Sequence, residues 1–142
     1  MDWVHFFTSF DGRISRQPFW IAWAVFIAIE IATTSTIDSE RWTSVLDLVL
    51  TYPQFAVCAK RGHDRNTPMW VVGIFFALSA LFDLLLLAGL VTLSDLRSQK
   101  PLALIFAIPL VILALALIID LGFRRGTVGP NRYGPDPLDT ST

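Results

Sequence analysis

Charged residues are scarce in this sequence, which argues against an ordinary soluble fold. Lysine, arginine, aspartate and glutamate make up 16% of the 142 residues, whereas soluble chains carry about 25%. Apolar residue types make up 54%, and the mean hydropathy is +0.57. Eleven basic and twelve acidic residues leave a net charge of -1. This balance argues against a protein whose main function is to bind a polyanion, so we expect no nucleic-acid partner.

Cysteine and histidine are also rare, and this limits the chemistry that the chain can perform. The single cysteine, Cys58, cannot form an internal disulfide and has no companion for a metal site. His63 lies beside Asp64, but one histidine and one carboxylate are too few ligands for a metal ion. No serine or cysteine nucleophile lies near this pair in the sequence. We therefore expect no cofactor, no metal, no catalytic residue and no enzymatic activity.

Long apolar runs dominate what is present. A membrane-spanning helix needs about 20 mostly apolar residues, with a range of about 17–25, and four runs are long enough. Glu30 interrupts the first run, which argues against a cleaved signal peptide. The sequence predicts an all-α fold, a four-span transmembrane helical bundle that forms one membrane domain over residues 1–142. The predicted spans are residues 18–37, 42–59, 69–91 and 102–123, followed by a cytoplasmic tail at 124–142.

The basic residues predict the orientation of the spans, because lysine and arginine prefer short cytoplasmic loops. Only three of the eleven would lie outside: Arg41, Arg97 and Lys100. The other eight would lie on one side if all four runs cross and both termini are cytoplasmic. Those eight are Arg13, Arg16, Lys60, Arg61, Arg65, Arg124, Arg125 and Arg132.

Three ordered motifs on this predicted cytoplasmic side match a known pattern. They are FDGRISRQPFW at 10–20, KRGHDR at 60–65 and GTVGPNRYGPDP at 126–137. Over nearly its whole length the chain resembles the bacterial family called domain of unknown function 805, the small YhaH-like inner-membrane proteins. The resemblance implies the bacterial inner (plasma) membrane and supplies no activity. The matching residues are Phe10, Gly12, Arg13, Arg16, Phe19, Trp20, Arg61, His63, Asp64, Gly126, Thr127, Gly129, Asn131, Tyr133, Gly134, Asp136 and Pro137.

The same motifs define a candidate site that we call the cap. One interpretation is structural: Asp64 pairs with Arg13 or Arg16, and His63 bonds a backbone carbonyl, which locks the end of the bundle. The other is a binding site for an anionic lipid headgroup or an acidic segment of a partner. A catalytic His–Asp pair is a third, weaker interpretation. The cap comprises Arg13, Arg16, Arg61, His63, Asp64, Asn131 and Tyr133.

Acidic residues inside the predicted spans form a second candidate site. At 1.5 Å per residue, Glu30, Asp47 and Asp83 all fall in the outer half of the bilayer. A charged side chain at mid-bilayer costs at least about 2.5–3.5 kcal/mol. We expect these three cavity acids to face one another, water or polar groups. They would be protonated and hydrogen-bonded across helices, or reach the outer interface, or form a cation or proton path. Polar residues at helical spacing share their face of the second span: Ser44, Asp47, Thr51, Gln54 and Cys58.

Two further expectations concern contacts within and between chains. Asp120 lies four residues before Arg124, which predicts an ion pair. Ala24, Ala28 and Ala32 form a small-residue stripe that permits close helix packing and with it a possible homodimer.

The leading functional hypothesis is a non-enzymatic accessory or interaction protein. Its partners would be the lipid bilayer and a membrane or cytoplasmic protein, or lipid headgroups at the cap. The alternative is a small proton- or cation-coupled transporter or channel that uses the cavity acids. A continuous wet cavity around these acids would favour transport.

Overall fold

The structure, a computed structural model, describes residues 2–139 and is all-helical, as predicted. Four helices are long and three helical segments are short. In chain order they are α1 (Trp3–Thr8), α2 (Arg16–Thr36), α3 (Glu40–Asp64), α4 (Met69–Leu87), α5 (Leu93–Arg97), α6 (Pro101–Leu117) and a π-helix, η1 (Ile118–Phe123), that continues α6.

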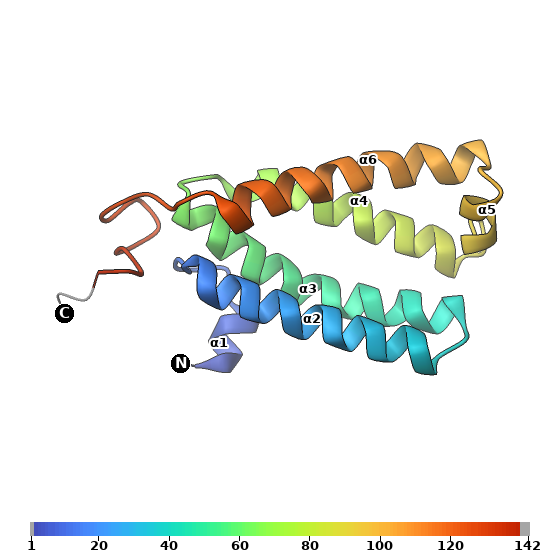
Figure 1. Cartoon of the computed structure of the whole chain (residues 1–142), viewed down its shortest axis with the longest axis horizontal. Coiled ribbons are helices and arrows are strands. Elements are labelled where there is room, and N and C mark those ends of the chain that lie inside the picture. Colours follow the sequence, from blue (N-terminus) through green and yellow to red (C-terminus); the bar gives the residue numbers. More distant parts are fainter. Residues whose placement is uncertain (1, 140–142) are drawn as a thin grey trace.

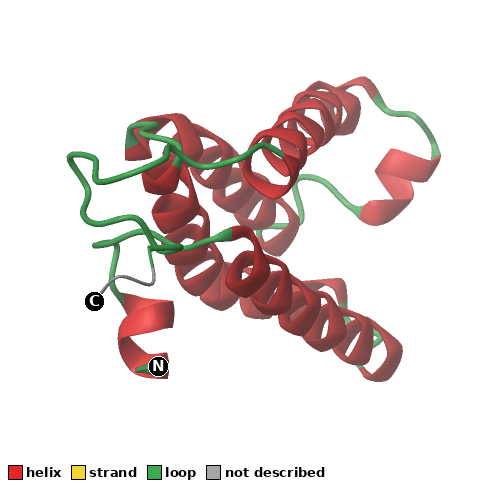
Figure 2. Ribbon diagram, turned by 60° about the vertical axis from the view of Figure 1, so that its left-hand side comes forward, coloured by secondary structure: helices red, strands yellow, loops and turns green. Residues whose placement is uncertain are grey.

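The four long helices run alternately in opposite directions and form a bundle (Figure 1). α3 is central in the packing, because it contacts α1, α2, α4 and η1, while α6 packs on α4. Short α1 and the tail lie at one end of the bundle, and α5 lies at the other (Figures 1 and 2). The segments on which the three motifs fall are therefore neighbours at one end.

Three helical segments are long and apolar enough to cross a membrane: Arg16–Thr36, Met69–Leu87 and Pro101–Phe123. Large apolar side chains cover their outer surfaces, including Ile27 on α2, Ile74 on α4 and Val111 on α6. An exposed apolar surface of this extent is typical of a protein that contacts lipid. α3 has 25 residues, but its polar stripe and charged ends lower its hydropathy, and it does not meet the same criterion.

Two predicted boundaries were wrong. The segment from Lys60 to Asp64 was predicted as a loop but forms the last turns of α3. Its charged groups find partners within the bundle, so the helix continues instead of ending at the first charge. The third run was predicted to reach Val91, but α4 ends at Leu87. Gly89, with φ of +72°, provides the left-handed residue that turns the chain toward α5.

Local signals explain where most helices begin. Asp2 caps α1, since its carboxylate accepts from the backbone N–H groups of Val4 and His5 at 3.0 and 3.2 Å. α5 has a capping box between Thr92 and Asp95. Pro101 occupies the first turn of α6, where its missing N–H is not needed.

The buried core lies between α1, α2, α3 and α4 in the half of the bundle next to the cap. It is rich in aromatic residues, and several of its ring pairs have the edge-on geometry that aromatic quadrupoles favour. Phe7, for example, meets Phe26 with ring centroids 5.8 Å apart at 75°. The largest members are Phe6, Phe19, Phe26 and Phe76. This core packs together the helix ends that carry the cap.

Candidate functional site

A buried aspartate at the end of α3 is the centre of the cap. Asp64 Oδ1 accepts hydrogen bonds from Nε and Nη2 of Arg13 at 3.1 and 2.9 Å, and Oδ2 pairs with Nη1 of Arg61. Both arginine side chains are 1% exposed and that of Asp64 is 5% exposed. Arg13 or Arg16 was predicted as the partner of Asp64. The structure confirms Arg13 and shows Arg61 as a second partner.

Backbone carbonyls accept most of the remaining hydrogen bonds of these two arginines. All five N–H groups of Arg13 have an acceptor, which is the full capacity of a guanidinium. The two arginines carry one positive charge more than Asp64 balances, and the carbonyl dipoles around them stabilise the excess. A ligand would find no free donor on Arg13. The accepting carbonyls belong to Thr127, Gly129 and Gly134 for Arg13, and to Ile14, Leu121 and Arg124 for Arg61.

The tail is bound to the end of α3 by backbone hydrogen bonds. The N–H and Oγ1 of Thr127 donate to the carbonyl of Asp64 at 2.8 and 2.9 Å. Asn131 Nδ2 donates to the carbonyl of His63 at 2.9 Å. Gly126 lies so close to the Asp64 carboxylate that a Cβ at this position would overlap it. The third motif thus closes the cap over the second.

His63 is buried against the tail and the loop before α2. Its ring stacks on that of Tyr133, with centroids 3.8 Å apart and planes at 6°. Its Nδ1 lies 3.3 Å from the carbonyl oxygen of Gly12, to which it donates. Burial lowers the pKa of His63, although the Gly12 hydrogen bond opposes the shift. The backbone-carbonyl partner expected for this histidine is therefore present.

Acidification should destabilise the cap through His63. Because the pKa of His63 is lower in the folded chain, the unfolded chain binds the proton more tightly, and stability rises with pH. This contribution to stability is complete at a pH above the pKa of the unfolded chain, about 6.5, and it is lost as the pH falls through the lower pKa of His63 in the folded chain. The thermal midpoint in detergent should therefore fall more from pH 7.5 to 5.5 in wild type than in His63→Phe, which keeps an aromatic ring on Tyr133.

The second histidine supplies the control for this measurement. His5 is exposed on α1, so His5→Phe should keep the pH dependence of the wild type. Equal pH dependence in wild type and His63→Phe would contradict the assignment.

Two other predicted contacts lie at the rim of the cap. Arg16 is exposed and donates from Nη1 to the carbonyl of Phe123 at 3.4 Å, instead of pairing with the central aspartate. The predicted ion pair between Asp120 and Arg124 is confirmed at 3.0 Å, and Arg65 joins it at 3.0 Å. Arg16 is thus a predicted cap residue that is exposed and has donors left for a ligand.

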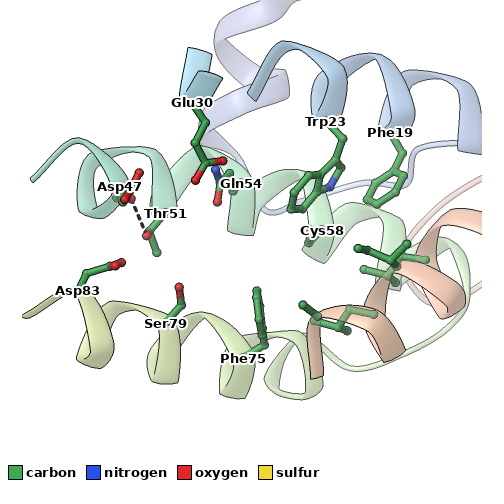
Figure 3. Close-up of a pocket in the computed structure, with 14 residues that line it drawn as sticks. Phe19, Trp23, Glu30, Asp47, Thr51, Gln54, Cys58, Phe75, Ser79 and Asp83 are labelled. Carbon is green, nitrogen blue, oxygen red and sulfur yellow. Dashed lines mark hydrogen bonds between the residues drawn. The ribbon is translucent and has the colours of Figure 1, made fainter. Parts of the chain in front are cut away.

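A cavity of about 300 Å³ lies between α2, α3, α4 and the α6–η1 segment, and the cavity acids line it. Glu30 comes from α2, Asp47 from α3 and Asp83 from α4, and Figure 3 shows them toward one end of the cavity, with Ser79. The predicted stripe on α3 faces the same space through Asp47, Thr51, Gln54 and Cys58. Ser44, its fifth member, is buried outside the cavity lining and donates to the carbonyl of Glu40 at 2.8 Å.

Most polar side chains of this cavity lack protein partners; Thr51, whose Oγ1 donates to the carbonyl of Asp47 at 2.8 Å, is an exception. In the described part of the chain, the side chains of Glu30, Asp47, Gln54, Ser79 and Asp83 make no hydrogen bond or ion pair. Asp83 is 8% exposed and points into the cavity (Figure 3). The acids do not hydrogen-bond across helices in the described part of the chain, which was one of the predicted arrangements. They do face one another and the α3 stripe, as predicted.

Several residues of the two sites were not predicted. Lys60 is buried and its Nζ donates to the carbonyls of His5 and Phe6 at the end of α1, at 2.6 and 2.9 Å. Ser79 was not predicted either, although Asp83 follows it four residues later on α4, a spacing that places both on one face of the helix. The alanine stripe of α2, at 24, 28 and 32, lies on the exposed side of the helix, and the homodimer stays a prediction.

Comparison with known proteins gives the chain a family. The family model described as "Protein of unknown function (DUF805)" matches residues 7–135. The chain is 34% identical over 138 residues to "Uncharacterized protein YiiR" of Escherichia coli strain K12, covering 92% of this chain and 87% of the relative. The same protein from Escherichia coli O157:H7 matches equally well. No solved structure matches significantly. Because the family model spans both the cap and the cavity, and the relatives match nearly end to end, this chain belongs to the DUF805 family.

Proposed function

We propose that the chain is a four-span protein of the bacterial inner membrane with both termini in the cytoplasm. At 1.5 Å per residue the 25 residues of α3 extend about 37 Å, more than the roughly 30 Å hydrocarbon core. α3 lies between α2 and α4, which are themselves apolar enough to span. The eight cations predicted to be cytoplasmic all belong to the end of the bundle that carries the cap, which supports this orientation.

Cysteine labelling tests this topology. Ser39 lies between α2 and α3, and Thr67 lies in the turn between α3 and α4. In intact cells, Ser39→Cys should react with a membrane-impermeant maleimide, and Thr67→Cys should react only after the membrane is permeabilised. The native Cys58 is buried and adds little background. Labelling of Thr67→Cys in intact cells would reject the model.

The function that the geometry supports best is binding of a cation in the membrane cavity, in a small cation- or proton-coupled transporter. One observation carries it: three acids from three helices line one cavity, and Asp83 is both buried and without a partner. Among the described residues, no lysine, arginine or histidine lines this cavity. An acidic cluster inside a membrane needs a counter-charge, and an entering cation or proton supplies one.

Flux measurements test the transport proposal. Phosphatidylcholine vesicles containing the protein and a trapped pH dye are given a gradient of Na⁺, K⁺, tetramethylammonium or benzyltrimethylammonium. At least one gradient should drive proton movement above that of empty vesicles. Asp83→Asn should reduce it about tenfold or more, because the buried carboxylate is the cation's partner.

The matched control is Asp38→Asn, which alters an exposed acid in the connection between α2 and α3. It should leave the flux unchanged. Absence of flux under all four gradients would reject transport. Equal loss in both variants would show that the effect does not come from the cavity.

A second candidate function, the accessory protein that binds lipid headgroups, has one supporting observation. Arg16 lies on a groove of about 470 Å³ next to the Trp20 indole and the Phe123 ring. Indole rings and arginines together are common where a protein meets lipid headgroups. If no gradient drives flux, lipid headgroup binding becomes the favoured function.

A further inference from the structure

The membrane cavity has two ends of different chemistry. The cavity acids and Ser79 lie toward one end, and aromatic and aliphatic side chains line the part nearer the cap (Figure 3). On α3 the lining extends from Asp47 to Cys58, 11 residues further along the helix, which is about 16 Å at 1.5 Å per residue. The cavity is therefore elongated along the bundle. The aromatic and aliphatic part of the lining includes Phe19, Trp23, Phe75, Leu117 and Leu121.

The acids are too far apart to form a metal site. Within residues 2–139 no three histidine, cysteine, aspartate or glutamate side chains lie close enough together to hold a metal ion. Mg²⁺ and Ca²⁺ require several oxygen ligands at about 2.0–2.6 Å. A bare ion would leave part of the acidic end unpaired and the whole apolar end unused.

A larger cation would use both ends at once. A volume of about 300 Å³ lies at the lower limit of small-molecule sites, which measure about 300–1,000 Å³. An ammonium group can be shared by carboxylates that do not converge on one point, because its charge is spread over several hydrogens or methyl groups. Aromatic faces such as that of Trp23 attract organic cations and also pack on an apolar body.

We infer that the ligand is an organic ammonium ion with an apolar body, lying along the cavity with its charged end among Glu30, Asp47 and Asp83 and its apolar body against Trp23 and Phe75. This inference rests on the proposed cation-binding function and adds the class of ligand. The buried, unpartnered carboxylate of Asp83 points to a charged partner, and the aromatic wall points to an apolar one. The acidic end lies away from the cap, so the ammonium group would occupy the periplasmic half.

Equilibrium binding to the full chain in phosphatidylcholine nanodiscs tests the inference. The probe is radiolabelled benzyltrimethylammonium, with binding to empty nanodiscs subtracted. Its competitors are neopentylbenzene, which has the same shape without the charge, tetramethylammonium, which lacks the apolar body, and Na⁺ and Mn²⁺. We expect one saturable site per chain. Unlabelled probe should compete for this site, and the four competitors at the same concentration should not.

Variants place the site in the cavity. Asp83→Asn should weaken probe binding about tenfold or more, and Trp23→Ala should weaken it while leaving the acids intact. Asp38→Asn should bind like wild type. Should Asp83→Asn fail to fold, as judged by size-exclusion chromatography, Glu30→Gln takes its place, since Glu30 lines the cavity from a more exposed position.

The outcomes separate the inference from the proposed function. In one outcome, tetramethylammonium, Na⁺ or Mn²⁺ displaces the probe as well as the unlabelled probe does, from a site that Asp83→Asn abolishes. That result would overturn the inference of an organic ligand with an apolar body, and it would leave the proposed cation site in place. Effective competition by neopentylbenzene would overturn the role of charge. No saturable binding of any of these cations, or binding that survives both Asp83→Asn and Glu30→Gln, would overturn the inference and the proposed function together.

Discussion

Replacing Asp64 with alanine should lower the stability of the folded protein by about 3–5 kcal/mol, the cost of removing one partner from a buried ion pair. The substitution leaves Arg13 and Arg61 buried, 1% exposed each, with two positive charges and no carboxylate. The carbonyl dipoles that now stabilise one excess charge cannot balance two. The midpoint of thermal unfolding in mild detergent should fall by many degrees.

Asp120→Ala is the matched control for this experiment. Asp120 also pairs with two arginines near the same end of the bundle, but its side chain is 30% exposed. Exposed ion pairs contribute about 0–1 kcal/mol, so the control should unfold close to wild type. If the two variants lost equal stability, burial of the cap would not be what makes Asp64 important.

The cap shows what charge patterning in a sequence can and cannot predict. The topology derived from the basic residues placed the three motifs on one side, and Asp64 was paired with one of two arginines. Arg61 could not be identified as the second partner, because Lys60–Asp64 was interpreted as a loop. Its orientation depends on α3 continuing to Asp64, and this continuation depends on tertiary partners such as the carbonyl of Leu121.

The polar wall of the membrane cavity was predictable, because it depends on spacing within one helix and not on tertiary contacts. Asp47, Thr51 and Gln54 recur at helical spacing in an apolar segment, and a lipid-facing position would be costly for them. Periodicity therefore identified the polar wall from α3 alone. The apolar end was not predictable, because Phe75 and Leu117 lie in runs that are apolar on all sides, where no pattern distinguishes a cavity from lipid.

Short elements escaped prediction altogether. α1 has six residues, too few for helical periodicity to be recognised, and it is stabilised by Lys60 at its C-terminal end. The π-helix η1 depends on how the end of α6 meets its neighbours. There Gly122 packs against the ring of Trp20 so closely that a Cβ would overlap it, and Trp20 Nε1 donates to the Gly122 carbonyl at 3.1 Å.

Gly126→Ala should separate the tail from the bundle. A Cβ at this position would overlap the Asp64 carboxylate, so either the carboxylate or the tail has to move. Over-packing alone costs about 1–3 kcal/mol, and a shift of Asp64 away from Arg13 would add to this. A shift of the tail would instead break the two hydrogen bonds from Thr127 to the Asp64 carbonyl. Both routes lower the thermal midpoint.

Trypsin distinguishes the two routes and tests the packing itself. If the tail moves, the bonds after Arg125 and Arg132 should be cut faster in detergent-purified Gly126→Ala than in wild type; if Asp64 moves, stability should fall without faster cleavage. Gly73→Ala is the control, because a Cβ there would meet the Phe55 ring at 3.6 Å, an ordinary contact, and alanine favours the helix by up to about 1 kcal/mol. It should melt at or above the wild-type temperature. A Gly126→Ala protein that melts and digests like wild type would contradict the close packing of the third motif on Asp64, and with it the closed cap.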